Sequence, residues 1–309
     1  MSTSTQKRIL YFPEFDDIKV STKTFTATTN LNIQIDQLYQ NLPITPYTVI
    51  TKRRGRKKKT EQPDPNQDVP EGSIITIKYE NEIRGVELKP KKNKQGKKKK
   101  WFRNSITVVI ILDKPINFKI CRNGTFQMTG CKSHSHAEEC IKYTWKYMKD
   151  NKEIYSLSHG DTLESMFIPS MRNIDFSLGF LVDREKLNQY MSTQDKIHCL
   201  LETSFGYTGV NIKIPIDKDI CLMDIKQLTY NPEDDTWLEE WKTYEDYLNT
   251  LSEKEKETKL SDKRFNTFLV FHSGKVIMSG LTADFMRDMY FYFTQIMQEC
   301  YEQIEERLD

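Results

Sequence analysis

Residues 118–133 read FKICRNGTFQMTGCKS, and residues 268–282 read FLVFHSGKVIMSGLT. In each stretch, a short apolar strand is followed by a turn that contains glycine and then by a second strand, which is typical of a β-hairpin. The turn glycines, Gly124 and Gly274, lie 150 positions apart (274 minus 124). A long segment with helical spacing of its apolar residues follows each hairpin. The same order occurring twice predicts that the chain contains two copies of one unit.

The elements around the first hairpin fit such a unit. β-Branched residues alternate over 19–30, which predicts a strand, and residues 31–43 predict a short helix that ends at a proline. A further strand is predicted at 105–115, directly before the hairpin, and a helix at 132–150 after it. The helix presents one apolar face, formed by Ala137, Cys140, Ile141, Thr144, Trp145 and Met148.

The second half repeats this order. Strands are predicted at 173–182 and 208–216, with a helix between them that begins after Asp183 as its N-cap. The closing helix is predicted at 282–308. Its apolar stripe is typical of a core-facing helix rather than of a cofactor site, and it consists of Phe285, Met286, Met289, Tyr290, Phe293, Met297 and Ile304. Strands and helices in this order favour an α+β protein, with helices on one face of an antiparallel sheet.

Composition excludes several classes of protein. The 309 residues carry a net charge of only +2, but basic residues crowd between 52 and 103 and acidic residues between 217 and 262. The N-terminal stretch lacks an apolar core of signal-peptide length, and no apolar run reaches the roughly 20 residues of a membrane span. We therefore expect a soluble, intracellular protein. Its six scattered cysteines fit a reducing compartment, and they are Cys121, Cys131, Cys140, Cys199, Cys221 and Cys300.

Two charged insertions interrupt the repeated pattern. The basic insertion, at about 52–100, is typical of a solvated loop, an import signal or a phosphate-binding segment, and its residues 73–85 predict an extra hairpin. The acidic insertion, at about 217–264, contains apolar residues at helical spacing within 234–257, which predicts an amphipathic helix. Its two tryptophans, Trp237 and Trp241, require a packing surface. Either this chain's own helices or a partner protein provides that surface.

The repeated hairpins resemble those of the TATA-binding protein family. RNGTFQMTGCKS and FHSGKVIMSG are similar to the family's two SGKxxxTGAK hairpins, one in each repeat. ATTNL at 27–31 resembles STVNL at the end of the family's first strand, and YTGVNIKIP at 207–215 resembles FPGLIYRMIKP. The resemblance covers both repeats but neither insertion. The Lys-, Ile- and Asn-rich composition further resembles the divergent versions carried by large DNA viruses.

The resemblance implies two pseudo-symmetric repeats that form a curved antiparallel saddle sheet with helices on its convex face. It places an N-terminal tail at 1–18, the first repeat at 19–160 and the second at 165–309. It also implies a general transcription initiation factor that binds and bends A·T-rich promoter DNA in the minor groove, mainly through the second repeat. The implied partners are a transcription factor IIB-like protein and the RNA polymerase machinery, in the host nucleus or a cytoplasmic viral factory.

The same resemblance assigns DNA-contacting positions. In the second repeat, Tyr207 and Phe271 occupy the wedge positions that unstack bases, and Asn173 occupies the position of a base-reading amide. Ile277 and Ser279 match groove-floor residues. Lys213 and Lys275 match phosphate-contacting residues of the second repeat. In the first repeat, Arg103, Thr129 and Lys132 match the family pattern, and Phe102 lies two residues from a wedge position.

The first repeat departs from the family pattern. Its wedge positions hold Asn104 and Cys121, and its amide position holds Thr24. Gln127 replaces a groove-floor valine, and Asp175 of the second repeat puts a carboxylate on the face that would meet DNA. These departures favour the alternative that the chain is a protein-interaction module that has lost TATA-specific DNA binding.

Catalytic, metal and cofactor chemistry find little support in the sequence. Cys131, His134, His136 and Cys140 lie close together, but their spacing does not match the paired ligands of structural zinc sites. The remaining histidines accompany no nucleophile, and no glycine-rich phosphate loop occurs. Helix-hairpin-helix DNA glycosylases share a related fold, but neither their partner motif nor a catalytic residue can be placed in this chain. We therefore expect a protein without enzymatic activity, metal or cofactor.

Overall fold

The computed structural model describes residues 9–49, 65–88, 103–201 and 209–306. The chain divides into two compact units, and each unit combines segments that are distant in sequence. Unit 1 consists of Met1–Lys23, Pro169–Met223 and Thr243–Asp309. Unit 2 consists of Thr24–Ile168 and Asp224–Lys242.

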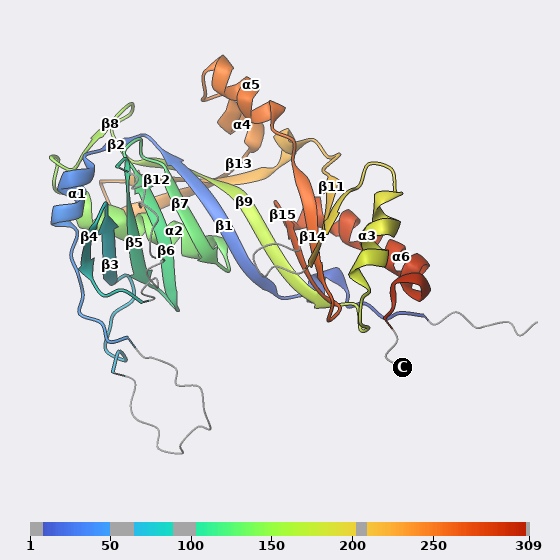
Figure 1. Ribbon diagram of the computed structural model, residues 1–309. Helices are drawn as coiled ribbons and strands as arrows, with labels where there is room; N and C mark the ends of the chain where they lie inside the picture. The colour runs from blue at the N-terminus through green and yellow to red at the C-terminus, as the bar shows by residue number, and fades with distance from the viewer. Residues whose placement is uncertain (1–8, 50–64, 89–102, 202–208, 307–309) are drawn as a thin grey trace, which may run out of the picture. The chain divides into compact units, whose positions relative to one another are not determined.

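Unit 2 contains the first hairpin within an antiparallel sheet of strand order β1-β7-β6-β5-β3-β4 (Figure 1). The residues of β1 from Thr24 onward belong to this unit. The strands are β1 (Val20–Thr29), β3 (Ile74–Tyr79), β4 (Glu82–Gly85), β5 (Ser105–Ile111), β6 (Pro115–Cys121) and β7 (Phe126–Cys131). A separate two-stranded sheet pairs β2 (Leu31–Ile33) with β8 (Tyr155–Leu157). The expected hairpin at 73–85 is confirmed, because β3 and β4 pair antiparallel and extend the sheet beyond β5.

One side of this sheet is buried against helices α1 (Ile35–Asn41) and α2 (His134–Met148). Alternate residues of the hairpin, Phe118, Ile120, Phe126 and Met128, are almost completely buried on that side. The expected apolar face of the helix at 132–150 is also confirmed, since all six of its residues are buried. Burial of alternate residues on one side only is the pattern of a sheet with one covered face.

Unit 1 is built in the same order. Its sheet has the strand order β10-β11-β14-β15-β9, where only the part of β9 (Glu164–Ser177) from Pro169 onward belongs to the unit. The other strands are β10 (His198–Leu201), β11 (Gly209–Pro215), β14 (Phe265–Phe271) and β15 (Lys275–Gly280). Helices α3 (Arg184–Ser192) and α6 (Ala283–Ile304) lie on one side of the sheet (Figure 1).

The core of unit 1 lies between the sheet and α6. Phe268 of β14 stacks on Phe293 of α6, with ring centroids 4.1 Å apart. The predicted N-cap of α3 is confirmed, because the Asp183 carboxylate accepts hydrogen bonds from two backbone amides, those of Glu185 and Lys186. The N-terminal segment also packs here, with the short 3-10 helix η1 (Phe15–Asp17) holding Phe15 against Tyr290 of α6.

Both hairpin turns require glycine for the same reason. Gly124 and Gly274 have positive φ angles of 72° and 75°, a conformation that L side chains rarely adopt. A Cβ at Gly124 would lie 2.2 Å from the carbonyl oxygen of Leu31, and one at Gly274 would lie 2.1 Å from that of Phe180. Each turn therefore packs directly against a neighbouring backbone, and any larger residue would force that backbone away.

The prediction of one amphipathic helix over residues 234–257 is wrong. Residues up to Thr243 form β13 (Thr236–Thr243), which pairs with β12 (Asp224–Asn231) in a hairpin. Only then do two short helices follow, α4 (Tyr244–Leu248) and α5 (Glu253–Ser261). Trp237 and Trp241 are four residues apart, a spacing that puts them on one face of a strand as well as of a helix. Because this segment pairs with β12, it forms a strand and not a helix.

The β12–β13 hairpin belongs to unit 2 and covers the outer side of α2. Tyr230 of β12 packs on Trp145 of α2 and on Trp237 of β13, with ring centroids 5.5 and 5.3 Å apart. Lys226 forms ion pairs with Glu138 of α2 at 2.8 Å and with Glu239 of β13 at 2.6 Å. Trp237 thus packs on this chain's own core, whereas Trp241 is 61% exposed.

The structure confirms the expected α+β class, with antiparallel strands and helices on one side of the sheet in each unit. Across the described ranges, no helix is long and apolar enough to span a membrane.

Candidate nucleic-acid interface

The side of the unit 1 sheet opposite α3 and α6 carries its own set of side chains, which we call open face 1. Strand register defines them, because directly paired residues of antiparallel strands point to the same face. One cross-strand row joins Lys213, Thr267, Ser279 and Asn173, and the next joins Asn211, Leu269, Ile277 and Asp175. A third row, at the hairpin end, contains Gly209, Phe271, Lys275 and Ser177.

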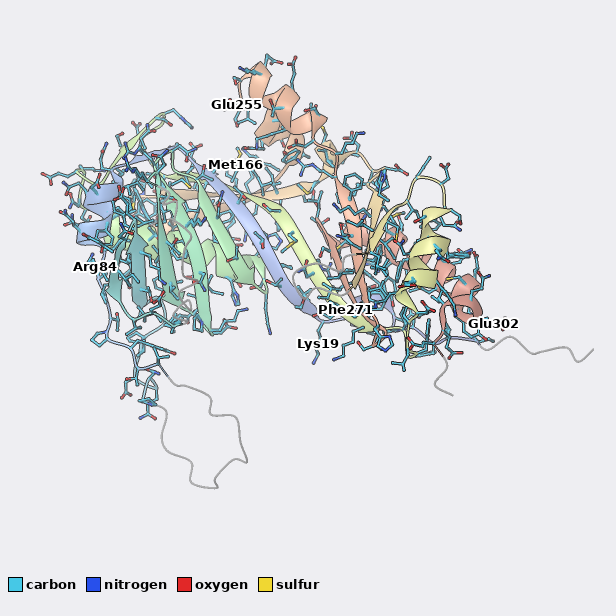
Figure 2. The ribbon with its side chains drawn as sticks, viewed as in Figure 1. Lys19, Arg84, Met166, Glu255, Phe271 and Glu302 are labelled. Carbon is cyan, nitrogen blue, oxygen red and sulfur yellow. The ribbon has the colours of Figure 1, made fainter. Side chains whose placement is uncertain are left out.

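Phe271 is the large aromatic residue of open face 1. It lies at the hairpin end of β14 and is partly buried (Figure 2). Together with Ile277 and Asp175, it lines a shallow hollow of about 950 Å³ whose wall is mainly apolar. Leu269, two residues earlier on β14, extends the apolar surface along the same face. An aromatic ring beside an open hollow is suited to contact a flat or apolar group of a ligand.

Two amides on this face have unused hydrogen-bonding capacity. The Oδ1 atoms of Asn173 and Asn211 are both buried and lack a hydrogen-bond partner in the described part of the chain. The backbone of Asn173 is fixed, since Ser21 donates a hydrogen bond to its carbonyl oxygen at 3.1 Å. Buried polar atoms of native proteins are usually paired, so both amides keep hydrogen-bonding capacity that the described residues leave unused.

Both signs of charge occur on open face 1. Lys213 and Lys275 are exposed at its margins, on β11 and β15. Asp175 is exposed between them in register with Ile277, and no ion pair or hydrogen bond reaches its side chain from any residue that the structure describes. The face therefore combines apolar, amide and hydroxyl groups with two exposed cations, and the Asp175 carboxylate interrupts that pattern.

The corresponding side of the unit 2 sheet, open face 2, is more polar. Its rows join Val109 to Asn117 and Thr129, Thr107 to Lys119 and Gln127, and Ser105 to Cys121. A hollow of about 580 Å³ is lined by Asn104, Ser105, Lys119, Cys121 and Gln127, among others. Burial raises the pKa of the Cys121 thiol, while nearby Lys119 opposes that shift. The thiol is therefore neutral and is no substitute for an aromatic wedge.

The outer part of open face 2 is occupied by the chain itself. Thr76 of β3 donates a hydrogen bond to the carbonyl oxygen of Val86, and Lys78 forms an ion pair with Glu87 at 2.5 Å. Thr76 and its register partner Val109 are consequently buried, although both point away from the helices. Open face 2 thus offers a ligand a narrower and more polar surface than open face 1.

The histidines of the cluster formed by Cys131, His134, His136 and Cys140 contact other side chains instead of a shared metal position. Nε2 of His136 lies 3.1 Å from the Asp113 carboxylate, and its Nδ1 accepts a hydrogen bond from the backbone amide of Lys132. The ring of His134 packs on Phe25, with centroids 4.7 Å apart. Within the described ranges, no group of three or more His, Cys, Asp or Glu side chains is arranged to hold a metal ion.

Six of the sequence-predicted contact residues lie together on open face 1, and they are Asn173, Lys213, Phe271, Lys275, Ile277 and Ser279. Three others belong to unit 2. Arg103 lies 3.6 Å from Glu80, Thr129 donates a hydrogen bond to the backbone of Asn117, and Lys132 follows β7. Phe102 and Tyr207 lie outside the described residues.

Sequence reasoning assigned no contact role to five members of open face 1, namely Gly209, Asn211, Thr267, Leu269 and Ser177. Alternation along β11 and β14 was the available signal, because Asn211 lies two residues before Lys213, and Leu269 lies two residues before Phe271. What alternation could not supply is which of the two apolar sides of β14 faces the helices. The stacking of Phe268 on Phe293 settles that point.

Comparisons with known proteins find similar viral proteins. No family model matches the chain. The chain is similar to the uncharacterized protein 335L of Invertebrate iridescent virus 6, with 30% identity over 220 residues, covering 68% of this chain and 65% of that protein. It is also similar to a TATA-box-binding protein-like protein of Acanthamoeba polyphaga mimivirus, with 26% identity over 223 residues, covering 64% of this chain and 54% of that protein. The chain thus spans less than two thirds of either relative.

Among solved structures, the TBP of Methanococcus jannaschii matches over 93% of this chain and 99% of its own length, with 13% identity and a TM-score of 0.42.

Proposed function

Because this chain is a divergent TATA-binding-protein-like protein, we propose that it binds double-stranded DNA in the minor groove through open face 1. The observation that carries the proposal is the composition of that face. Phe271, Leu269 and Ile277 give it an apolar centre, while the side chains of Asn173 and Asn211 hold unpartnered amide oxygens. Lysines at the margins complete a surface with groups for the bases and for the backbone of DNA.

Each group has a physical role in such a complex. TATA-binding protein itself is a standard example of proteins that insert apolar side chains between base steps and kink the duplex, and Phe271 would take that role here. The NH₂ groups of Asn173 and Asn211, rather than their unpartnered oxygens, can donate to the N3 and O2 acceptors of A·T pairs. Lys213 and Lys275 neutralise phosphates, which releases counterions and makes binding dependent on salt.

We propose further that this binding serves transcription initiation on A·T-rich promoters, without catalysis by this chain. The support is the similarity to the mimivirus protein, whose name describes it as TATA-box-binding protein-like. A transcription factor IIB-like protein and RNA polymerase are the partners that this role requires. The host nucleus and a cytoplasmic viral factory are the two compartments in which it would operate.

The second candidate function is a protein-interaction module. Open face 2 favours it, since Cys121, Gln127 and Lys119 replace what the other unit has as Phe271, Ile277 and Leu269. The exposed Asp175 also favours it, because a carboxylate is repelled by phosphates. On this alternative, the hollow beside Phe271 would accept a protein side chain.

Fluorescence anisotropy of the full chain on an A·T-rich duplex and on a scrambled duplex of equal length separates the two functions. Minor-groove binding predicts that log K falls linearly with log salt between about 50 and about 200 mM, with about 0.9 lost from the slope for each lysine-phosphate contact removed. Lys275→Met should therefore reduce the magnitude of the slope by about 0.9, the value for one phosphate contact. Lys254→Met, on α5, should leave the slope unchanged. Failure of the wild-type chain to bind either duplex would support the protein-interaction module.

A further inference from the structure

Asp175 lies in the middle cross-strand row of open face 1, on β9, the last strand of the unit 1 sheet. It lies on β9 between Asn173 and Ser177, and its direct partner across the sheet is Ile277. Ile277 in turn pairs with Leu269, and the same row ends at Asn211. The carboxylate also borders the hollow beside Phe271. A ligand that fills this hollow against Phe271 and Ile277 therefore also meets Asp175.

The carboxylate has no partner of its own. No described residue forms an ion pair or a hydrogen bond with it, and the neighbouring Oδ1 of Asn173 is unpartnered too. An amide can turn its NH₂ group toward an acceptor, but an ionised carboxylate only accepts hydrogen bonds. Covering Asp175 with a ligand that offers no donor would cost free energy, because a desolvated charge without a hydrogen bond is unfavourable.

The floor of the minor groove determines which base pair can supply that donor. A·T and T·A pairs present only the acceptors N3 of adenine and O2 of thymine, whereas a G·C pair adds the N2 amino group of guanine. We propose that Asp175 accepts a hydrogen bond from this amino group, so that the preferred site is an A·T-rich sequence with a G·C pair at the position under β9. This inference rests on the proposed function and names the substrate of open face 1 more narrowly.

The carboxylate then has two opposite effects on binding. It weakens binding to every duplex through repulsion of phosphates, and it strengthens binding selectively where a purine N2 amino group lies beneath it. The same side chain that favours loss of DNA binding in general therefore becomes a specificity element. Asn and Val replacements separate the effects, because Asn removes the charge but keeps an acceptor oxygen, whereas Val removes both.

The experiment begins with selection of bound sequences from a duplex pool with a randomised core, using the full wild-type chain. Each adenine of an A·T-rich binding duplex is then replaced in turn by 2,6-diaminopurine, which adds an N2 amino group to an A·T pair and leaves the acceptors in place. We expect one position at which the replacement tightens binding about tenfold, within the range for a good base contact. Inosine in place of the selected guanine should reverse the gain.

The variants identify the residue responsible. Asp175→Val should abolish the preference for the added amino group, while Asp175→Asn should retain part of it and bind all duplexes more tightly than wild type. Asp288→Asn, which removes a carboxylate from α6 on the helix side, is the matched charge control and should change neither.

Two failures are distinguishable. If the wild type binds duplexes but diaminopurine has no effect at any position, or if Asp175→Val keeps the preference, the inference is wrong and the proposed function stands. If the wild type selects no duplex, the proposed function fails and the inference fails with it.

Discussion

The two sheets differ on one side only. At positions related by the offset of 150, their helix-facing sides are alike, with Phe118 and Ile120 of unit 2 matching Phe268 and Val270 of unit 1, all fully buried. Their open faces are not alike. Lys119, Cys121 and Gln127 in unit 2 stand where unit 1 has Leu269, Phe271 and Ile277. Packing against helices restricts the covered side to apolar residues, whereas only a ligand restricts the open side. Under the proposed function, this difference predicts that the two units contribute unequally to DNA binding.

The largest effect should come from the side on which the units agree. Phe268→Ala and Phe118→Ala should each lower the free energy of unfolding by about 3–5 kcal/mol, because each removes a buried ring and leaves a cavity. Urea denaturation followed by circular dichroism measures both losses. A large loss from one variant and a negligible loss from the other would show that the covered sides are not equivalent.

A second prediction concerns how α2 of unit 2 and α6 of unit 1 are covered. The β12–β13 hairpin covers α2 of unit 2, whereas α6 of unit 1 leaves Phe291 and Tyr292 46% and 40% exposed. Lys226→Met should destabilise the protein by about 3 kcal/mol, because among the described residues it leaves the buried Glu138 carboxylate with Lys142, at 3.8 Å, as its remaining ion-pair partner. Lys242→Met, on the same hairpin, is the matched control in urea denaturation. Equal losses from the two variants would contradict a special role for the Lys226 ion pairs.

A third prediction attempts to remove the difference between the open faces. Cys121→Phe would place a ring in the hollow of about 580 Å³ on open face 2, at the position that matches Phe271. We expect a gain in DNA affinity of about 1 kcal/mol, the lower end for a stacked aromatic residue. Anisotropy on the selected duplex measures the gain, and Cys121→Leu controls for apolarity without an aromatic face. No change with Phe would mean that open face 2 does not approach the bases.

The smallest effect concerns the helix that follows the first strand of each repeat. Asp183 caps α3 with two backbone hydrogen bonds, whereas Gln34 at the start of α1 makes none. Asp183→Ala should cost about 1 kcal/mol at neutral pH, and Gln34→Ala much less. The hydrogen bond from the Lys186 backbone, with a smaller opposing effect of burial, lowers the pKa of Asp183 in the folded state.

The lowered pKa of Asp183 determines how its contribution to stability depends on pH. A carboxyl whose pKa is lower when folded adds stability that is fully present above its unfolded value of about 4 and is lost as the pH falls through the folded value. The stability difference between wild type and Asp183→Ala should therefore shrink in acid. A difference that stays constant from neutral pH to about pH 2 would contradict the role of the charged cap.

Local patterns were sufficient to predict much of this fold. The hairpins, their turn glycines and the stripe of α6 follow from alternation, from the need for positive φ and from helical spacing. The β12–β13 hairpin could not be predicted in this way. Trp237 and Trp241 fit a helix and a strand equally well, and the decision came from Tyr230 packing between Trp145 and Trp237, contacts between distant parts of the sequence.

The candidate interface was predictable to a similar extent. Resemblance to a known family placed Asn173, Phe271 and Ile277 on one face, and the strand registers bring them together. The unpartnered oxygen of Asn211 and the burial of Thr76 beneath the chain at Val86 depend on the folded surroundings. No local pattern contains that information, because both result from the packing of the chain around these residues.

The most direct test of the account compares Phe271→Ala with Cys121→Ala in DNA affinity at one salt concentration. We expect Phe271→Ala to weaken binding by about 1–3 kcal/mol, since a ring that contacts unstacked bases is lost, and Cys121→Ala to leave binding unchanged. Unchanged circular dichroism would show that both variants remain folded. Equal losses from the two variants, or no loss from Phe271→Ala, would contradict the claim that open face 1 carries the interaction with DNA.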